Sequence, residues 1–505
     1  MTRAAGDAGA RGADFLQLSP ASAPARGLTS WLADAVRAAV IDGRLQAGAP
    51  LPATRVLAED LGISRGVIVE AYQRLADEGL VSARPGAGTR VLGVRRAIPP
   101  GAVAPEAAPR VAVTTGARAR ETGRLPERWR ARAEIDLSPG VPDLAGFPRA
   151  AWLRAERAVL QRASVADLGY GDPRGSPWLR TELASWLART RGLRAEPDDI
   201  IIVTGVAQAF ALLAQALARA LGRGSAAGEI GVEDPGSRGS RDELAYWGLR
   251  PAPIGVDDHG LMVDELVRTG LRAVLITPAH QFPTGVVLAP RRRRDLLDWA
   301  ARTDALVIED DYDAEYRYDR APVPALQASA PGQVAYAGST SKTLAPGLRL
   351  GWLIPPDRMQ AGLIEAKHAS DLGSPALPQL VLAQLIASGE LEQHIRGVRK
   401  RQRHRRDALL HALREHLPQA RVQGVAAGLH LLITFPERAG TAGRYLADTT
   451  LAERILEAGV LVHPLSWHRQ RPGPAGLVLG YAAHTPDQLR QAARRIAGVL
   501  ASARS

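Results

Sequence analysis

The chain has 505 residues, a length typical of two or three domains, and its 46% hydrophobic content is sufficient for a complete core. It contains no cysteine, which excludes disulfides, cysteine-based metal sites and a cysteine nucleophile. The net charge of +12 favours polyanionic partners, and because the sequence shows neither a signal peptide nor an apolar run of the ~20 residues that span a membrane, we expect a cytoplasmic protein with no membrane partner.

The N-terminal region predicts a mobile tail and then a small helical module. Residues 1–25 are mainly Ala, Gly, Pro and Ser, which predicts a tail without a packed core. From Leu28 onward apolar residues recur at helical spacing, and glycines end each helical run. The expected elements are helices over 28–42, 54–61 and 64–78, the last capped by Ser64, and strands over 80–84 and 89–92.

Three helices and a hairpin predict a winged helix-turn-helix over residues 26–95. The helix-turn-helix step places Ser64, Arg65 and Gly66 at the N-terminal end of the third helix, which meets base edges in the major groove. Arg55 begins the second helix, where it can bind a phosphate, and the glycine-rich turn can follow the minor groove. A helical module that binds protein is the alternative.

Three segments in this order resemble the GntR-type winged helix of bacterial regulators: 51–58, 64–72 and 86–89. The resemblance implies contacts with double-stranded DNA. The implied contact residues are Arg55, Ser64, Arg65 and Gly66 in the helices and Gly86, Gly88 and Thr89 in the wing. Arg74 lies farther along the third helix, and we interpret it as a solvated or backbone-facing charge.

Residues 96–133 predict a linker. Prolines break every helical period, and Ala, Val and Arg dominate the composition. The arginines can attract nearby phosphates without sequence specificity, or the segment can be a tether that only controls reach.

Residues 134–505 predict a large α/β domain. Short apolar runs at 200–203, 229–232, 273–276 and 306–308 alternate with amphipathic segments, which is typical of a mostly parallel sheet covered by helices. Such sheets bind ligands at the carboxyl ends of their strands. The turn 204–208 follows one strand and opens an apolar helix, so its N–H groups form a candidate phosphate site.

Lys342 lies in the segment 338–352 and is one of only three lysines in the chain. A Schiff-base lysine must be neutral at some stage, which lysine allows and arginine does not. Ser339, Ser341 and Arg349 are donors that an adjacent phosphate requires. We interpret the segment as an anchor for pyridoxal 5'-phosphate (PLP), with a loop that carries one exposed lysine as the alternative.

Residues 309–313 form an acidic cluster directly after a predicted strand. Crowded carboxylates repel one another unless a positive group is near, and a pyridinium nitrogen is such a group. An aspartate against this nitrogen keeps the ring protonated, and a tyrosine can bind the ring hydroxyl. A metal site is the alternative, but the cluster lacks a histidine or a spaced third carboxylate, so we expect no metal.

Five segments in the expected order resemble fold-type I PLP-dependent enzymes of the aminotransferase class: 135–143, 170–175, 277–285, 310–312 and 339–351. Joined to a GntR-type winged helix, this domain is similar to the MocR subfamily of regulators. The resemblance implies that Lys342 carries the Schiff base with PLP, Asp310 pairs with the pyridine nitrogen, and Tyr312 binds the ring hydroxyl.

The same resemblance implies a phosphate site and a dimer. The implied phosphate donors are Ser339, Ser341, Arg349 and the turn at Val206 and Ala207, and Tyr170 would reach a phosphate across the dimer interface. His280 is a candidate for contact with PLP or substrate, and it can equally be a buried structural residue.

The sequence departs from catalytic aminotransferases at three positions. Phe282 replaces an asparagine, Ser237 replaces an aromatic residue that stacks on the cofactor, and Val478 replaces the arginine that holds the substrate carboxylate. Arg238, Arg241 or Arg471 are the candidates to substitute for that arginine. We therefore expect cofactor binding without efficient amino-acid docking.

The sequence as a whole predicts a homodimeric, PLP-dependent DNA-binding transcription regulator. Its aminotransferase-like domain would sense PLP, or an amine or amino acid that reacts at Lys342. The absent carboxylate anchor favours PLP itself and control of vitamin B6 genes. The rivals are an active aminotransferase with a DNA-binding appendage and a DNA-binding protein whose large domain has lost PLP.

Overall fold

A computed structural model describes most of the two predicted domains. The described residues are 16, 18–20, 23–24, 27–84, 88–92, 127–221, 228–319, 323–424, 426–435 and 447–502. Contacts divide the chain into two compact units, residues 1–116 and 117–505. Gly86, much of the predicted tail and most of the predicted linker lie outside the described residues. None of the helices within the described ranges combines the length and apolarity that a membrane crossing requires.

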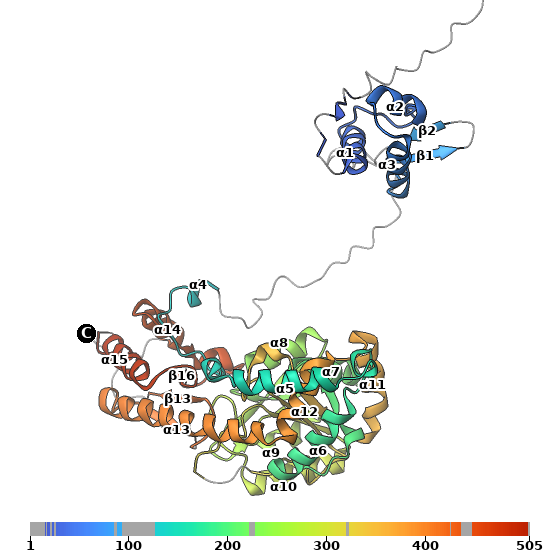
Figure 1. The fold of residues 1–505 in the computed structure, drawn as a ribbon. Helices are drawn as coiled ribbons and strands as arrows, with labels where there is room; N and C mark the ends of the chain where they lie inside the picture. Colours follow the sequence, from blue (N-terminus) through green and yellow to red (C-terminus); the bar gives the residue numbers. More distant parts are fainter. Residues whose placement is uncertain are drawn as a thin grey trace, which may run out of the picture. The chain divides into compact units, whose positions relative to one another are not determined.

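The first unit is a three-helix module with a two-stranded wing (Figure 1). Its elements are α1 (Leu28–Ile41), α2 (Thr54–Leu61), α3 (Arg65–Asp77), β1 (Val81–Arg84) and β2 (Gly88–Val91). The two strands are antiparallel, with Val81 opposite Val91. Leu32, Leu57 and Leu75 are fully buried and join the three helices in one core.

The N-terminus of α3 differs in one respect from the expected capping by Ser64. Ser64 does occupy the N-cap of α3, but its side chain makes no capping hydrogen bond. Ser64 is exposed at the start of the helix. Arg37 on α1 pairs with Glu78 at the end of α3, with Nη2 and Oε1 2.5 Å apart, and this ion pair joins the first and third helices.

The second unit contains an eight-stranded sheet in the order β4-β11-β10-β9-β8-β5-β6-β7. Its strands are β4 (Ile201–Val203), β5 (Glu229–Asp234), β6 (Arg250–Asp257), β7 (Gly260–Leu261), β8 (Ala273–Ile276), β9 (Leu306–Asp311), β10 (Val334–Ser339) and β11 (Gly351–Ile354). The neighbours from β10 to β6 pair in parallel. Apolar runs such as 273–276 are buried on both faces, which is what a covered parallel sheet requires. The predicted fold class is confirmed.

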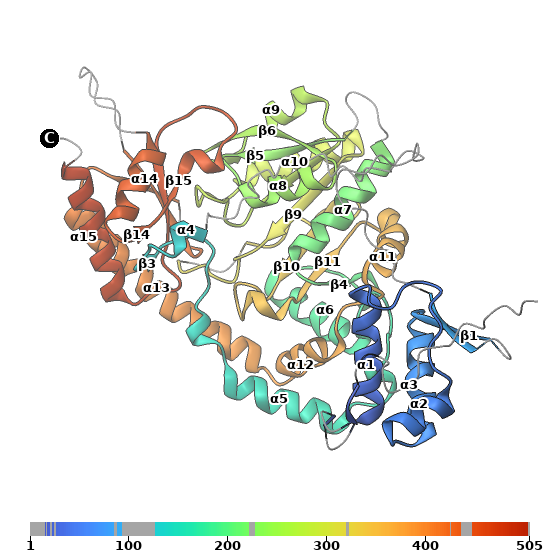
Figure 2. The ribbon, with the colours of Figure 1, turned by 90° about the horizontal axis from the view of Figure 1, so that it is seen from above.

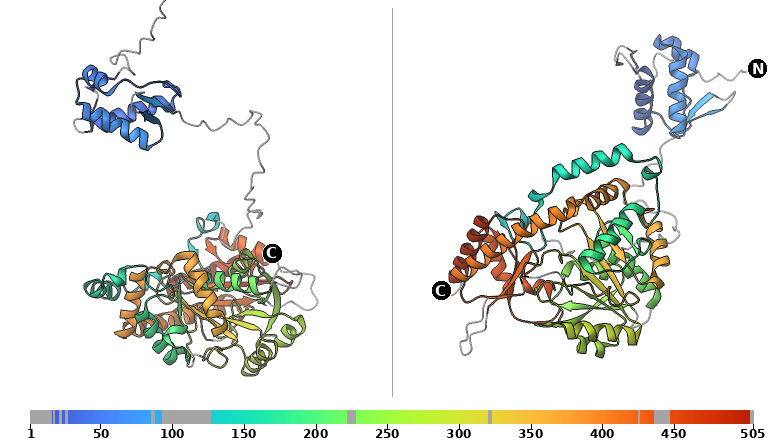
Figure 3. Two further views of the ribbon diagram at one scale, coloured as in Figure 1. Left: turned by 90° about the vertical axis from the view of Figure 1, so that its right-hand side faces the viewer. Right: turned by 60° about the horizontal axis from the view of Figure 1, so that its bottom comes forward.

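Helices cover both faces of this sheet. They are α5 (Arg149–Arg162), α6 (Pro177–Arg191), α7 (Val206–Leu221), α8 (Arg238–Tyr246), α9 (Val263–Thr269), α10 (Pro290–Thr303), α11 (Asp357–Asp371) and α12 (Ala376–Ala387). Figure 2 shows α7 along β10 and β11, and α7 shares a core cluster with α11. Helices α5, α6 and α12 pack together in a second cluster, and Figure 3 shows α5 alongside the α12 region.

A smaller four-stranded sheet follows the long helix α13 (Glu390–His416). Its order is β12 (Arg421–Gln423), β13 (His430–Thr434), β16 (Gly476–Gly480), β15 (His463–Pro464). Helix α13, α14 (Asp448–Glu457) and α15 (Pro486–Ser502) share its core. The short pair β3 (Ile135–Asp136) and β14 (Val460–Leu461) links the start of the unit to this end.

The remaining elements are one-turn helices. These are α4 (Glu127–Arg130) and the 3-10 turns η3 (Leu144–Gly146), η4 (Ala166–Leu168), η5 (Pro197–Asp199), η6 (Pro346–Leu348) and η7 (Leu465–His468). Two of them, η4 and η6, border segments that the sequence predicts to bind a cofactor.

Candidate functional site

A cavity of about 460 Å³ lies at the carboxyl ends of the parallel strands. This volume is within the ~300–1,000 Å³ range of small-molecule sites. Thr277 follows β8, Asp310 is near the end of β9, and Ser339 ends β10, so adjacent strands deliver their polar residues to one place. Lining residues from Pro139 to Arg349 therefore converge where an α/β sheet binds its ligand.

Lys342 lies in this cavity with its amine held by the main chain. Its Nζ donates a 2.7 Å hydrogen bond to the carbonyl oxygen of Gly140. Gly140 has a φ of +81°, and a Cβ there would lie 3.3 Å from the amine, so the close approach favours glycine. Burial lowers the pKa of Lys342 below its usual value, while Asp310 and Asp313 oppose this shift. A lowered pKa makes the neutral, nucleophilic amine more accessible.

Asp310 has the property that a pyridinium partner requires. Its Oδ1 is buried and has no hydrogen-bond partner among the described residues. Burial, reinforced by Asp311, raises the pKa of Asp310 to about 7. A buried acceptor without a donor is costly, and a protonated ring nitrogen would satisfy it. The donor set of the cavity therefore fits PLP.

Tyr312 is connected to a pair of residues behind the cavity. Its hydroxyl lies 3.0 Å from Nδ1 of His280, and the same nitrogen lies 2.9 Å from Oδ2 of Asp313. Tyr312 lines the cavity, whereas His280 does not. His280 is 3% exposed, so any effect of its ring on a ligand would pass through Tyr312.

The predicted phosphate donors gather at one side of the cavity. Its lining there includes Val206, Ala207, Ser339, Ser341 and Arg349. The first N–H groups of α7 have no intrahelical acceptor, and the helix N-terminus favours an anion. Arg349 adopts a φ of +53° and donates to the carbonyl of Thr204. A Cβ on Gly205, whose φ is +95°, would lie 2.9 Å from this guanidinium, so glycine is required there.

The first turn of α7 is held from outside the cavity. Gln208 donates a 2.7 Å hydrogen bond to Asp371, and Asp371 pairs at 2.8 Å with the amine of Lys367. The Lys367 side chain is fully buried, so its amine is committed to this structural pair.

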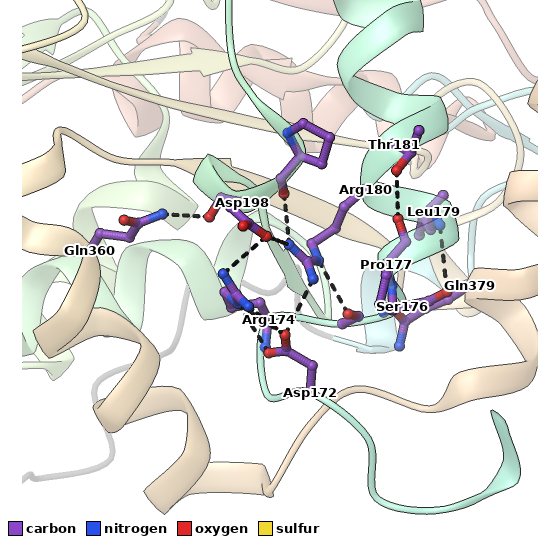
Figure 4. A network of polar contacts seen from close by, with 12 residues as sticks. Asp172, Arg174, Ser176, Pro177, Leu179, Arg180, Thr181, Asp198, Gln360 and Gln379 are labelled. Carbon is purple, nitrogen blue, oxygen red and sulfur yellow. Dashed lines mark hydrogen bonds and ion pairs between the residues drawn. The ribbon is translucent and has the colours of Figure 1, made fainter. Parts of the chain in front are cut away.

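Tyr170 lies outside the cavity and is 85% exposed. The loop that carries it is fixed by a network around Asp172 (Figure 4). Arg174 and Arg180 both pair with Asp172, at 2.7 and 3.2 Å, and both also pair with Asp198. An exposed aromatic side chain on a rigid loop is suited to contact another molecule.

The end of the cavity where substrates would dock lacks a carboxylate anchor. Phe282 and Ser237 line the cavity, but Val478 is fully buried in β16 beside Leu432 and Leu465. Among the described lining residues Arg349 is the only arginine, and it belongs to the phosphate side.

The three arginines that could substitute for the missing anchor have other partners. Arg241 donates to the carbonyls of His468 and Trp467. Arg471 pairs with Glu265 at 2.5 Å, and Arg238 pairs with Asp242 at 3.5 Å. None of the three lines the described cavity.

The acidic cluster 309–313 does not converge on one point. Glu309 accepts the N–H groups of Leu326 and Gln327, Asp311 pairs with Arg191, and Asp313 contacts His280. Successive side chains of β9 face opposite sides, which separates these carboxylates. His280, Asp313 and His430 do place possible ligand atoms within 4.8 Å of one another, but Nδ1 of His280 is engaged by Asp313 and Tyr312.

The first unit presents the predicted DNA-binding residues on its surface. Arg55, Ser64, Arg65, Gly66 and Gly88 are exposed, and Thr89 is partly exposed. Arg74 pairs with Glu70 at 2.6 Å and donates to Ser30, so it is occupied within the unit.

Two features of these surfaces have no clear signal in the sequence. Glu243 on α8 lines the cavity, and burial raises its pKa to about 7 while Arg349 opposes the shift. Val69 is 47% exposed on α3, one turn after Arg65, where an apolar side chain can contact a thymine methyl group. Helical spacing predicts the exposure of Val69 only once the buried face of α3 is known.

Two protein families match this chain. The family described as "Aminotransferase class I and II" matches residues 132–496, and "Bacterial regulatory proteins, gntR family" matches residues 28–91. Together they cover both structural units.

Two relatives match along most of their length. The chain is 31% identical to "Probable rhizopine catabolism regulatory protein MocR" of Rhizobium meliloti over 91% of either chain. It is 33% identical to "HTH-type pyridoxine biosynthesis transcriptional regulator PdxR" of Corynebacterium glutamicum, over 91% of this chain and 93% of the relative.

Solved structures match the second unit. The kynurenine aminotransferase of Pyrococcus horikoshii, determined with PMP, has a TM-score of 0.68 and 27% identity and covers 75% of this chain and 95% of its own. A multiple substrate aminotransferase from Thermococcus profundus has a TM-score of 0.67 and 27% identity, over 75% and 94% of the two chains.

Proposed function

Because the chain belongs to the MocR subfamily of GntR-type transcription regulators, with an aminotransferase class I and II domain that uses PLP, we propose that this domain senses PLP itself. The observation that carries the proposal is the cavity itself. It combines a buried lysine amine, an unpartnered buried carboxylate and a phosphate cradle, yet its described lining has no arginine for a substrate carboxylate. Such a site favours the cofactor over an amino acid.

Each residue of the cavity has a role in this proposal. When bound, PLP supplies an aldehyde that reacts with amines and a ring that withdraws electrons. Lys342 would attach the cofactor covalently, and Oδ1 of Asp310 would accept the proton of the ring nitrogen. Tyr312 would bind the ring hydroxyl, and its position is fixed through His280. Ser339, Ser341, Arg349 and the N–H groups of Val206 and Ala207 would hold the phosphate.

The effector proposal has support from one relative. PdxR of Corynebacterium glutamicum is named as a regulator of pyridoxine biosynthesis. A response to a B6 compound would let a regulator match vitamin B6 genes to supply, and a cavity without a carboxylate anchor suits that task. An amine or amino acid that reacts at the Lys342-linked cofactor is the alternative effector.

The DNA-binding surface and the assembly complete the proposal. We propose that Arg55, Ser64, Arg65, Gly66 and Val69 contact the major groove and the phosphates. The wing residues Gly86, Gly88 and Thr89 would follow the minor groove. Two copies would form a homodimer that places Tyr170 against the partner's cofactor phosphate, and a regulator of bacterial genes would act in the cytoplasm.

The test is a titration of PLP against binding of the full-length protein to DNA from upstream of its own gene. Fluorescence anisotropy gives the DNA affinity, and absorbance follows the Lys342-linked cofactor in the same samples. We expect PLP to change DNA affinity or half-site preference, and amino acids to leave the cofactor absorbance unchanged. If DNA binding were the same with PLP, without it and with amines, the sensing proposal would be wrong. Loss of cofactor absorbance with an amino acid would instead support the aminotransferase alternative.

A further inference from the structure

A second cavity, of about 220 Å³, lies between α6 and α13. We call it the arginine cavity and define it by Arg189, Arg191, Arg396, Arg399, Trp186 and Glu315, which line it. It shares no lining residue with the cofactor cavity. Its volume is below the range of drug-sized sites, so a small molecule would fill it.

The charges around the arginine cavity are incompletely balanced. Arg191 pairs with Asp311 at 2.6 Å, and Arg189 pairs with Glu392 at 3.1 Å. Arg399 donates through Nε to the main-chain carbonyl of Glu315 at 2.8 Å. Among the described residues, neither Arg396 nor Arg399 has a carboxylate within ion-pair distance. Four arginines line the cavity against the carboxyl groups of Glu315 and Glu392, so arginine side chains outnumber acidic ones there, and an anion can bind to the excess.

Two residues that line this cavity each carry a buried donor with no acceptor in the described part of the chain. They are Nη2 of Arg191 and Nε1 of Trp186. Both side chains belong to residues that are 2% exposed and that line the cavity. Because arginine and tryptophan side chains only donate hydrogen bonds, a ligand that satisfied these groups would have to present acceptor atoms.

We propose that the arginine cavity binds a small oxyanion, a carboxylate or phosphate compound. Guanidinium groups bind both kinds of oxyanion in a planar, bidentate manner. Trp186 and Ile395 provide an apolar wall on which the rest of the ligand can pack.

The arginine cavity is connected to the cofactor site through β9. Arg191 holds Asp311, and Tyr336 donates to the same carboxylate oxygen at 2.5 Å. Asp311 is the neighbour of Asp310 and faces the opposite side of the strand. A ligand in the arginine cavity would thus contact Arg191, which holds Asp311 in the strand that also carries Asp310. This proposal does not depend on which compound is the effector of the cofactor cavity.

The test uses the PLP-loaded full-length protein, so that the phosphate cradle at Arg349 is already filled. Inorganic phosphate and malonate are titrated separately by calorimetry at constant ionic strength. We expect saturable binding of at least one probe. The double variant Arg396→Gln/Arg399→Gln should weaken it at least tenfold.

A matched control removes the same charge from the same helix. Lys400→Gln/Arg403→Gln replaces two exposed side chains of α13 outside the cavity, and it should leave binding unchanged. Both variants must retain the cofactor absorbance of the parent, which shows that the unit is folded. If Arg399→Gln destabilises the unit, Arg396→Gln alone should still weaken binding. Absence of saturable binding by both probes, or equal loss in the cavity and control variants, would overturn the proposal.

Discussion

The Nζ atom of Lys342 donates a 2.7 Å hydrogen bond to the carbonyl oxygen of Gly140, 202 positions earlier in the chain. The amine is thereby aimed into the cavity before any ligand is bound. The lowered pKa of Lys342 and the raised pKa of Asp310 both follow from burial at this point. Both shifts favour the uncharged forms of the two groups that an incoming aldehyde meets.

Lys342→Ala should abolish covalent attachment of PLP while leaving the fold and basal DNA affinity in place. The reason is that Lys342 is the only lysine that lines the described cavity. Borohydride reduction followed by mass spectrometry of the intact chain measures the attachment. Lys400→Ala on the exposed surface of α13 is the control and should retain it. A normal response of DNA binding to PLP in Lys342→Ala would exclude the covalent bond as the signal.

Asp310→Asn should flatten the pH dependence of stability in protein freed of PLP. The pKa of Asp310 is raised from 3.8 to about 7, so the folded state keeps a proton that the unfolded chain has lost. The free energy of unfolding therefore falls as pH rises from about 4 to about 7, and this carboxyl contributes at most a few kcal/mol. Urea unfolding across this pH range measures the slope. Asp298→Asn, at an exposed position of α10, should keep the parental slope, and an unchanged slope in Asp310→Asn would contradict the assigned burial effect.

Arg65→Ala should weaken operator binding by about 1–3 kcal/mol if the side chain reads a base, and it should relax sequence preference at one position. Arg65 is exposed at the start of α3, where the helix meets the major groove. Arg74→Ala on the same helix is the control of equal charge, because Arg74 is paired with Glu70. Anisotropy at several salt concentrations separates a base contact from a phosphate contact. Equal losses in the two variants would indicate that net charge alone is responsible.

Tyr170→Phe should lower PLP affinity about tenfold or more if its hydroxyl binds a phosphate in the partner subunit. Mixing this variant with Lys342→Ala should then restore one intact site in each mixed dimer, because the two changes fall in the other site. PLP titration of the mixture after subunit exchange measures the restored sites. A mixture that binds no better than the two variants alone would place Tyr170 in its own subunit's site, or outside any site.

The sequence predicted the positions of the strand ends well enough to bring Asp310, Tyr312, Ser339 and Lys342 together. Parallel strands that read as continuous apolar runs leave little ambiguity, and ligands gather where such strands end. It also indicated that Val478 replaces the arginine of the carboxylate anchor, but it left Arg238, Arg241 and Arg471 open as substitutes. The structure shows that Arg241 donates to main-chain carbonyls and that Arg471 pairs with Glu265.

Other features depend on contacts between distant segments. The left-handed backbone of Arg349, the placement of His280 behind Tyr312 and the burial of Glu243 arise from packing that no local pattern encodes. The acidic cluster shows the limit most clearly. Its five adjacent positions suggest one charged site, but strand alternation sends Asp310 and Asp311 to opposite faces of β9.

The burial of the Lys367 amine against Asp371 leaves the chain with a very simple pattern of lysine reactivity. Lys342 is accessible to an aldehyde small enough to enter the cofactor cavity, whereas a bulky acylating reagent in solution meets Lys400 on the surface of α13. Of the three lysines, a dye or a surface linker would therefore attach at Lys400, which does not line the cofactor cavity. The unmodified sequence thus already carries one surface lysine for fluorescence or immobilisation experiments.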